Sequence, residues 1–424
     1  MAQELPGRGM KRTTAWAMYD WANSTYATTV MAGFFPLFFK EYWASGLSVN
    51  ESTFWLGLAN SVAAVLMALM APVLGAIADQ GGLKKRILLQ FMTLGVVTTA
   101  ALFWVEKGEW AWAALIYALS ALGFSGANTF YDSLLIDVAE YKHLDRVSSL
   151  GYGLGYIGGG LLFALNVLMT LHPGWFGLSG KTAAVRWSFM SVAIWWAVFT
   201  IPLGLYVHER NEAKHVDLAA SIRGGFKQLI TSFRQVRRYR MAFLFLLGYF
   251  FYIDGVGTVT HMAVDYGLSL GFHAGVLMTA LLLTQFVAFP AAIALGYVGE
   301  RIGTRPTILF CIGGYVLACI WGYRMQVEMD FYMLAGLIGL VMGGVQALSR
   351  SMYARLIPEG CAGEFFGFYN MLGKFAAILG PTLMGITSLV TGDVRLSILS
   401  IIPLFAIGAF LLLRVREDDG QSVV

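Results

Sequence analysis

Residues 75–86 read GAIADQGGLKKR, and the organisation of the whole chain can be worked out from this segment. It lies between two apolar segments, Trp55–Ala78 and Ile87–Val105, each long enough to cross a membrane as a helix. Paired glycines allow two helices to reverse direction within a short turn. The Lys-Lys-Arg cluster is typical of loops on the cytoplasmic side of a membrane. The stretch therefore predicts a tight cytoplasmic turn between two membrane-spanning helices.

The same turn returns in the second half of the chain, where residues 296–306 read GYVGERIGTRP. One constant offset relates four positions of the two loops: Gly75, Asp79, Gly82 and Lys84 correspond to Gly296, Glu300, Gly303 and Arg305. Two copies at one spacing indicate that the chain is an internal duplication. Many membrane transporters are built from repeats in this way.

The loop resembles the signature loop between the second and third helices of the major facilitator superfamily, G-x-x-x-D-x-x-G-x-[KR]-[KR]. The resemblance implies that the loop latches one conformation of a transporter. We expect Asp79 to lie near a helix N-terminus of the bundle that neighbours its own, and the basic residues to pair with acids. The predicted gating residues are Gly75, Asp79, Gly82, Lys84, Lys85, Arg86, Glu300, Arg301 and Arg305.

The composition indicates a membrane protein. Of the 424 residues, 58% are hydrophobic and only 13% are charged, whereas a soluble protein carries about 25% charged residues. Apolar windows of about 20 residues recur along the whole chain, and each can cross a hydrocarbon core of about 30 Å as a helix. We therefore predict an all-α integral membrane protein whose twelve transmembrane helices form two pseudo-symmetric six-helix bundles, the major facilitator superfamily fold.

Cysteines and histidines give no sign of a metal site or a cofactor. The three cysteines and six histidines show neither a disulfide framework nor metal-ligand spacing. No pairing of a nucleophile with a base is visible either. The sequence therefore predicts no metal, no cofactor and no enzyme activity. The basic residues behind the net charge of +4 are placed for topology, so we expect no nucleic-acid partner.

Lysine and arginine residues concentrate in alternate loops, as the positive-inside rule requires if both termini are cytoplasmic. Residues 208–239 are the one stretch with soluble character. They divide the chain into an N-terminal six-helix bundle, residues 1–207, a cytoplasmic linker, residues 208–239, and a C-terminal six-helix bundle, residues 240–424. Part of the linker, Ile222–Val236, has the pattern of a basic amphipathic helix that lies on the membrane; a plain tether is the alternative.

A second repeat carries opposite charges in its two copies. Residues 126–155 align without gaps on residues 344–373, which sets Asp132 against Arg350. Residues that a central pseudo-twofold axis relates can face each other across that axis. We therefore expect one half of the protein to present an acid where the other half presents a base.

Polar and ionisable residues inside the predicted helices are candidates for binding a solute or a proton, because an unpaired charge within a membrane is costly. They are Asp20, Asn23 and Tyr26 in the first predicted helix, Asn128 and Asp132 in the fourth, Tyr252, Asp254 and His261 in the seventh, Gln346 and Arg350 in the tenth, and Lys374 in the eleventh. The first, fourth, seventh and tenth helices each begin one three-helix repeat. Each of these four helices holds one of the charges.

Two roles remain open for the charges nearest the cytoplasmic side, which are Asp20, Asp132, Arg350 and Lys374. They either contact the solute or form ion pairs that close the cytoplasmic side as a gate. Asp254 and His261 lie nearer the middle and the outside of the predicted helix Arg240–Tyr266. For these two residues we expect proton binding or solute binding.

Several stretches resemble one branch of the superfamily, the vacuole effluxer-like transporters. The matching stretches are Tyr19–Ser24 (YDWANS), Tyr252–Val256 (YIDGV), Gln346–Ser351 (QALSRS), Ala354–Pro358 (ARLIP), Glu364–Gly367 (EFFG) and Gly373–Lys374 (GK). That family includes an autophagy-related exporter of amino acids from vacuoles and many bacterial members. The resemblance implies the twelve-helix fold and secondary transport, in a multi-pass protein of the bacterial cytoplasmic membrane.

We therefore expect a monomeric carrier that works by alternating access between two bundles. Its solute is small and polar, with an amino acid or a similar zwitterion as the first guess, because acids and bases both line the expected cavity. Protons bound at Asp254, with Asp20 or Asp132 as the alternatives, are the expected energy source. A sugar or peptidoglycan-fragment permease and a lipid-handling carrier of the same fold are the alternatives.

Overall fold

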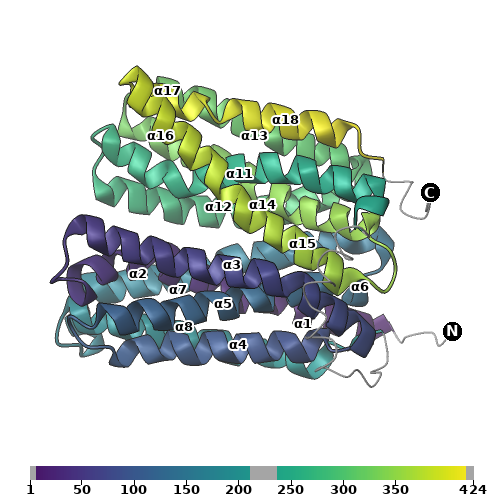
Figure 1. The fold of residues 1–424 in the computed structure, drawn as a ribbon, viewed down its shortest axis with the longest axis horizontal. Coiled ribbons are helices and arrows are strands. Elements are labelled where there is room, and N and C mark those ends of the chain that lie inside the picture. The colour runs from purple at the N-terminus through teal and green to yellow at the C-terminus, as the bar shows by residue number, and fades with distance from the viewer. Residues whose placement is uncertain (1–5, 211–235, 417–424) are drawn as a thin grey trace.

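The computed structural model describes residues 6–210 and 236–416, and this part of the chain is helical with no β-strand. Figure 1 shows the helices lying side by side in two groups, with the N-terminal half of the chain below and the C-terminal half above. The N-terminal group contains α1 (Pro6–Thr25), α2 (Phe35–Phe38), α3 (Val49–Gly81), α4 (Lys84–Ala101), α5 (Trp110–Ser133), α6 (Leu135–Val138), α7 (Leu144–Leu171) and α8 (Lys181–Tyr206). The C-terminal group contains α11 (Arg240–Ser269), α12 (Ala274–Ile302), α13 (Thr304–Arg324), α14 (Glu328–Leu356), α15 (Ala362–Phe375), α16 (Leu379–Thr391), α17 (Val394–Leu399) and α18 (Ile402–Leu413).

Eleven helical segments in the described part of the chain are long and apolar enough to cross a membrane. The first segment is helical from Pro6 to Trp43, through α1, a π-helical stretch at Tyr26–Phe34, α2 and a second π-helical stretch at Phe39–Trp43. This segment is not among the eleven, because polar residues such as Asp20 make it less apolar. It packs along α7 and α8 as the first of the six long helical segments of the N-terminal bundle. The predicted all-α membrane fold is confirmed. The domain limits at 207 and 240 stay a prediction, since most of the linker lies outside the described residues.

The two repeated turns have the backbone that their glycines predict. Gly82 ends α3 in the left-handed conformation with φ 59°, and α4 begins two residues later at Lys84. Gly303 ends α12 with φ 112°, and α13 begins at the next residue. Positive φ is available to glycine at little steric cost. Both turns lie at one end of the molecule, on the right in Figure 1, which we call the motif end.

The sequence predicts one helix over Glu364–Thr391 with a bend at Gly380–Pro381, and the structure divides this segment into two helices. A short 3₁₀ turn, Ala376–Ile378, separates α15 from α16. Pro381 lies in the first turn of α16. Proline has no backbone N–H to donate a helical hydrogen bond, and its ring clashes with the carbonyl group four residues earlier. The break therefore follows from the proline that the sequence places here.

Gly75 and Gly363 bring the two halves of the protein into direct backbone contact at the motif end. A Cβ atom added at Gly75 would overlap the carbonyl oxygen of Gly363, and one added at Gly363 would lie 2.7 Å from the carbonyl oxygen of Gly75. Helices α3 and α15 can therefore cross this closely only because both positions are glycine.

Replacing Gly75 by valine should hold the two halves apart at this end. Overpacking costs about 1–3 kcal/mol, which lowers the population of the closed arrangement by about 5- to 150-fold. The measurement is the rate at which a membrane-impermeant maleimide labels a cysteine placed at Ser149, which is fully buried. Gly57→Val is the matched control, since it lies in the same helix with open space around its Cβ position. Equal labelling rates in the two variants would contradict the prediction.

Candidate functional site

The guanidinium of Arg350 joins the two halves of the protein. It belongs to α14, within two turns of the motif end, and is only 1% exposed. Its Nη1 atom lies 3.0 Å from Asp132 Oδ1, and its Nη2 atom lies 3.4 Å from Asp20 Oδ2. Nε donates to Ser148 Oγ and Nη2 donates to the Ser148 carbonyl oxygen, both at 2.9 Å. One arginine thus bonds to α1, α5 and α7.

Neighbouring side chains support this cluster from both halves. Tyr131 donates its hydroxyl hydrogen to Asp20 Oδ2 at 2.8 Å, and Asn370 of α15 donates to Asp132 Oδ2 at 3.0 Å. The rings of Trp16, Tyr131 and Tyr152 surround the guanidinium, with the closest centroid 4.3 Å from Cζ. A planar guanidinium stacks on aromatic rings while its edges donate hydrogen bonds. We call Arg350, Asp20 and Asp132 the central gate cluster.

The absence of a side chain at Gly151 makes room for the central gate cluster. A Cβ atom on Gly151 would lie 2.6 Å from Asp20 Oδ2 and 3.1 Å from Arg350 Nη2. Residues 151–160, GYGLGYIGGG, are part of α7 and pack against α1 and α12. The glycine-rich stretch therefore serves close helix packing, as its position in an apolar helix predicts.

A second interface cluster is centred on Asp145, a residue for which the sequence analysis assigns no role. Asp145 lies in the first turn of α7, is 1% exposed and pairs with Arg355 of α14 at 2.9 Å. It also accepts hydrogen bonds from Thr304 at 2.8 Å and from Ser351. From the sequence alone we predict a helix over Val147–Leu171, which leaves Asp145 in the preceding loop. Acidic residues are enriched in the first turn of a helix, so Asp145 could have indicated that this helix begins before Val147.

Asp79 latches the two halves of the protein together. Its carboxylate accepts hydrogen bonds from the backbone N–H groups of Gly363 at 2.8 Å and Glu364 at 2.9 Å, at the N-terminus of α15. That helix belongs to the opposite bundle, the neighbour of the bundle that contains Asp79. The short distance between α3 and α15 brings this N-terminus within reach.

The equivalent turn in the second half also contacts the opposite bundle. Glu300 lies 3.3 Å from His143 and 3.8 Å from Arg146, beside the start of α7. Arg146 additionally donates to the hydroxyl oxygen of Tyr297 at 2.9 Å. The two turns therefore form pseudo-symmetric contacts on either side of the central gate cluster.

The basic residues of the turns stabilise their own bundles. Lys84 lies 3.4 Å from Asp79 and 3.3 Å from Asp137, so it pairs with two acids of its own bundle. Lys85 and Arg305 hydrogen-bond to carbonyl oxygens at the ends of α8 and α18, where a cation is favourable. The remaining two predicted gating residues, Arg86 and Arg301, are exposed.

The described beginning of the linker is fastened to the first turn. Glu209 accepts hydrogen bonds from the backbone N–H groups of Lys84 at 3.1 Å and Lys85 at 2.9 Å, at the N-terminus of α4. Burial raises the pKa of the Glu209 carboxyl, and these hydrogen bonds oppose the shift. The amphipathic helix considered for Ile222–Val236 lies outside the described residues, apart from Val236.

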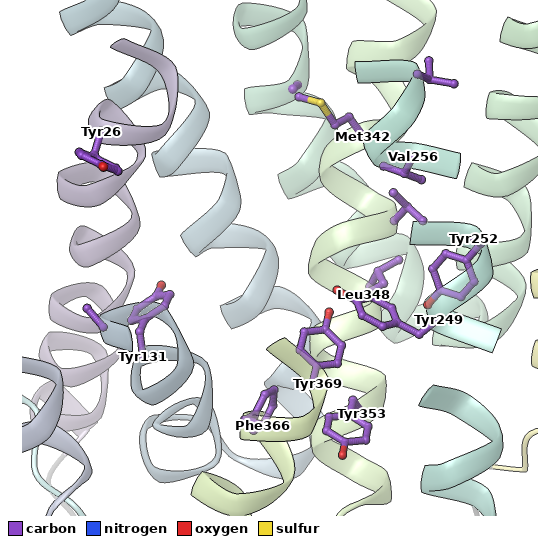
Figure 2. Packing of buried hydrophobic residues seen from close by; sticks show 14 of the residues in the cluster. Tyr26, Tyr131, Tyr249, Tyr252, Val256, Met342, Leu348, Tyr353, Phe366 and Tyr369 are labelled. Atoms are coloured by element: carbon purple, nitrogen blue, oxygen red, sulfur yellow. The ribbon is translucent and has the colours of Figure 1, made fainter. Parts of the chain in front are cut away.

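Four predicted binding residues make contacts away from the central gate cluster. Asn23 hydrogen-bonds to Asn128. Tyr26 bonds to Ser120 at 2.6 Å and Tyr252 to Ser349 at 2.6 Å, each inside its own bundle. Figure 2 shows Tyr26 at the upper left, above Tyr131, and Tyr252 among the aromatic side chains of the C-terminal half. Both tyrosines are fully buried, so they pack the bundles.

Gln346 lies where the two halves meet. Its side-chain oxygen accepts a hydrogen bond from Tyr156 of α7 at 3.1 Å. Tyr156 and Gln346 come from opposite bundles. This contact extends the interface from the central gate cluster away from the motif end.

Three predicted residues remain outside the network around Arg350. Asp254 is 1% exposed, and neither carboxylate oxygen has a hydrogen-bond partner in the described part of the chain. The backbone N–H groups of Leu379 and Gly380, at the start of α16, lie close to it. His261 is exposed on α11, and Lys374 lines a hollow between the two halves.

Comparisons with known proteins agree with this architecture. A family model described as "Vacuole effluxer Atg22 like" matches residues 42–144 and 136–423. The chain is 41% identical to the "Uncharacterized MFS-type transporter YxiO" of Bacillus subtilis, over 98% of this chain and 97% of that protein. It is 21% identical to Autophagy-related protein 22 of Chaetomium globosum, over 89% of this chain and 71% of that protein.

Solved structures show the same fold at low sequence identity. The proton:xylose symporter XylE matches with a TM-score of 0.75 and 12% identity, over 98% of each chain. The transporter FucP in its outward conformation matches with a TM-score of 0.62 and 12% identity, over 96% of this chain and 98% of that chain. These likenesses establish the fold of two helical bundles.

Proposed function

Because this chain belongs to the vacuole effluxer Atg22-like family of major facilitator transporters, we propose that it is a secondary active carrier that works by alternating access. It is a multi-pass integral membrane protein and a transporter rather than an enzyme. The solute is small and polar, and an amino acid or a similar zwitterion fits the charges best. Protons supply the energy, and the membrane is the bacterial cytoplasmic membrane. The carrier acts as a monomer with both termini in the cytoplasm.

The observation that carries the proposal is the central gate cluster. Arg350 of one bundle donates to Asp20 and Asp132 of the other, and the three residues are all at least nine-tenths buried. Separating buried charges that bridge two bundles costs free energy, so these ion pairs stabilise the closed arrangement. They can break and form again when one bundle rocks against the other. In this conformation the motif end is closed by Arg350, by Asp145 with Arg355, and by the two repeated turns.

The bonds of the central gate cluster decide which charges are left for a solute. Asp20 and Asp132 are engaged by Arg350, which favours the gate over solute contact for these three residues. Asp254 and Lys374 are not engaged by any of them. One is an acid and the other a base, so together they offer a partner for the amine and a partner for the carboxylate of a zwitterion.

Asp254 is also the proposed proton-binding residue. A buried carboxylate without a hydrogen-bonding partner is unfavourable, and adding a proton removes that cost. Asp254 lies beside the break between α15 and α16. Because α15 contacts the opposite bundle at Asp79 and Gly75, a change in the charge of Asp254 can alter the contact between the bundles.

Transport into proteoliposomes tests the function. We expect an inward-directed proton gradient to drive accumulation or extrusion of at least one labelled amino acid, and a proton ionophore to abolish it. Labelled sugars serve as the comparison class, and liposomes without protein give the background. Gradient-driven movement of sugars, with none for any amino acid, would support the permease alternative and contradict the amino-acid proposal.

A further inference from the structure

The start of α16 lies against two buried polar side chains of α11. Neither the carboxylate oxygens of Asp254 nor the hydroxyl oxygen of Thr258 form a hydrogen bond in the described part of the chain, and both residues are 1% exposed. Thr258 follows Asp254 by four residues, so the two side chains lie on one face of α11. Buried polar groups without partners are costly inside a membrane bundle. This face of α11 therefore holds hydrogen-bonding groups whose partners are still to be found.

The hydroxyl of Thr258 differs from most threonine hydroxyls of this protein. Thr260, Thr284 and Thr382 each donate to the carbonyl oxygen four residues earlier in their own helix, and Thr258 makes no such bond. It lies instead against the backbone of α16, because a Cβ atom added at Gly380 would overlap its Oγ1 atom. The hydroxyl is thus free to bond to the side chain one turn earlier in α11.

Helix α16 begins with backbone donors that its own residues do not satisfy. The residue before its first turn, Ile378, has no side-chain hydrogen bond to offer. The backbone N–H groups of Leu379 and Gly380 lie close to Asp254. The first N–H groups of a helix lack partners within it, and their partial positive charge stabilises an anion. An ionised Asp254 is therefore suited to cap α16, as Asp79 caps α15.

The charge of Asp254 depends on a proton and on this contact. The positive end of a helix disfavours a metal cation beside it, so a proton is the ion that fits. Besides burial, the N–H groups of Leu379 and Gly380 are the influences on the Asp254 carboxyl within the described residues. Ionisable side chains on the helices packed against α11 contact other partners: Arg350 in the central gate cluster, Lys374 near His261, Tyr315 on Phe405, Arg395 at the Met325 carbonyl and Glu300 near His143.

We propose that Asp254 caps the start of α16 when it is ionised, and that Thr258 accepts its hydrogen when it is protonated. Backbone N–H groups cannot accept a hydrogen bond, so the protonated carboxyl has to turn to a different partner. Thr258 is then a positioning residue for the proton, and α16 loses its cap when the proton binds. This inference rests on the proposed proton-coupled carrier function and specifies how the proton acts on the structure.

An apolar cavity beside this contact gives α16 room to move. It is lined by Thr258 and Met262 of α11, by Met384 of α16 and by Ile398 of α17, among others. Met384 follows Gly380 by four residues, so the cavity adjoins the face of α16 that meets α11. Methionine side chains adapt readily to a change in packing. Because coupled equilibria are reciprocal, a proton at Asp254 weakens the docking of α16 by the same factor by which docking disfavours the proton.

Hydrogen–deuterium exchange of the purified full chain in detergent tests the contact. The measured quantity is the protection of the backbone amides in a peptide spanning residues 376–384, after correction for the change in intrinsic exchange rate with pH. We expect protection to fall by about 2- to 30-fold as the pH is lowered through the titration of Asp254, the range that loss of an N-terminal cap gives. Asp254→Asn should show the same protection at every pH.

The position of the titration tests Thr258 separately. Thr258→Val keeps the shape of the side chain but removes the acceptor from the protonated carboxyl. The midpoint should therefore move to lower pH by about 0.5–1 unit, as expected for the loss of one neutral hydrogen bond. Thr258→Ser should restore the wild-type midpoint. Thr260→Val is the matched control, because that hydroxyl donates to the Val256 carbonyl oxygen of its own helix at 2.8 Å.

The outcomes separate this contact from the carrier function. Protection that does not change with pH over the range in which the wild type stays folded would overturn the contact, even if protons drive transport in proteoliposomes. A midpoint in Thr258→Val that equals or exceeds that of the wild type would overturn the role of Thr258. Protection that depends on pH and on Asp254, in a protein whose transport ignores the proton gradient, would support the contact and overturn the proton-coupled function.

Discussion

Replacing Arg350 by glutamine should release the motif end of this transporter and abolish accumulation of its solute. The substitution removes the cation from a buried site and leaves Asp20 and Asp132 without their shared partner. Breaking a buried ion pair from one side costs about 3–5 kcal/mol. Since about 1.4 kcal/mol corresponds to a factor of ten, the closed arrangement should become at least about 100-fold less populated.

Arg350→Lys should rescue little of this loss. The guanidinium reaches Asp132, Asp20 and both oxygens of Ser148 from its planar edges. A lysine ammonium presents three donors from a single point and cannot reproduce that fork. We therefore expect Arg350→Lys to resemble Arg350→Gln in labelling and transport.

Accessibility of a buried cysteine measures the change. Cysteine at Ser149, in a chain whose three native cysteines are replaced by alanine, should react with an impermeant maleimide much faster in Arg350→Gln than in the parent. Arg301→Gln is the control, because Arg301 is an exposed arginine at the same end. If Arg350→Gln is labelled as slowly as the control, the central gate cluster does not hold this end closed.

Exchange of the charges gives an independent check. Asp132→Arg combined with Arg350→Asp should recover part of the closure that either single variant loses, because the pair is restored with its sign reversed. A double-mutant cycle isolates this pairwise term. Additive losses would show that the contact between the two residues contributes nothing to closure.

Replacing Asp254 by asparagine should uncouple transport from the proton gradient. Asparagine keeps the size of the side chain but cannot exchange a proton at this position. We expect gradient-driven accumulation to fall to the level of liposomes without protein, while exchange of labelled for unlabelled solute across the membrane continues. Exchange needs the alternating conformations but no net proton movement.

The measurement compares accumulation and exchange in the same proteoliposomes. Glu359→Gln removes an exposed acid in the loop before α15 and should leave both activities unchanged. Accumulation that persists in Asp254→Asn would exclude Asp254 as the coupling residue. Loss of exchange as well would show that the Asp254 charge is needed to bind the solute amine or to change conformation, and would leave its part in proton coupling contradicted.

The sequence by itself was sufficient for the architecture. Helix length, apolar composition and the positive φ of Gly82 and Gly303 depend on residues close together in the chain, so local patterns predict them. The internal repeat also identified Asp132 and Arg350 as opposed charges, and these two residues do form an ion pair. Pro381 likewise indicates the break in its helix, because its effect on backbone bonding is local.

Only the tertiary structure decided which charges meet. Helical spacing places a residue on a face of its helix, but the partner of that face depends on how each helix is rotated and how closely it crosses its neighbours. Gly151 leaves room for Asp20 and Arg350 beside α7, and these two residues hydrogen-bond there. Gly75 allows α3 to approach α15, and Asp79 therefore reaches the opposite bundle. The same packing leaves Lys374 without a partner in the described chain, because no acid of a facing helix reaches its hollow.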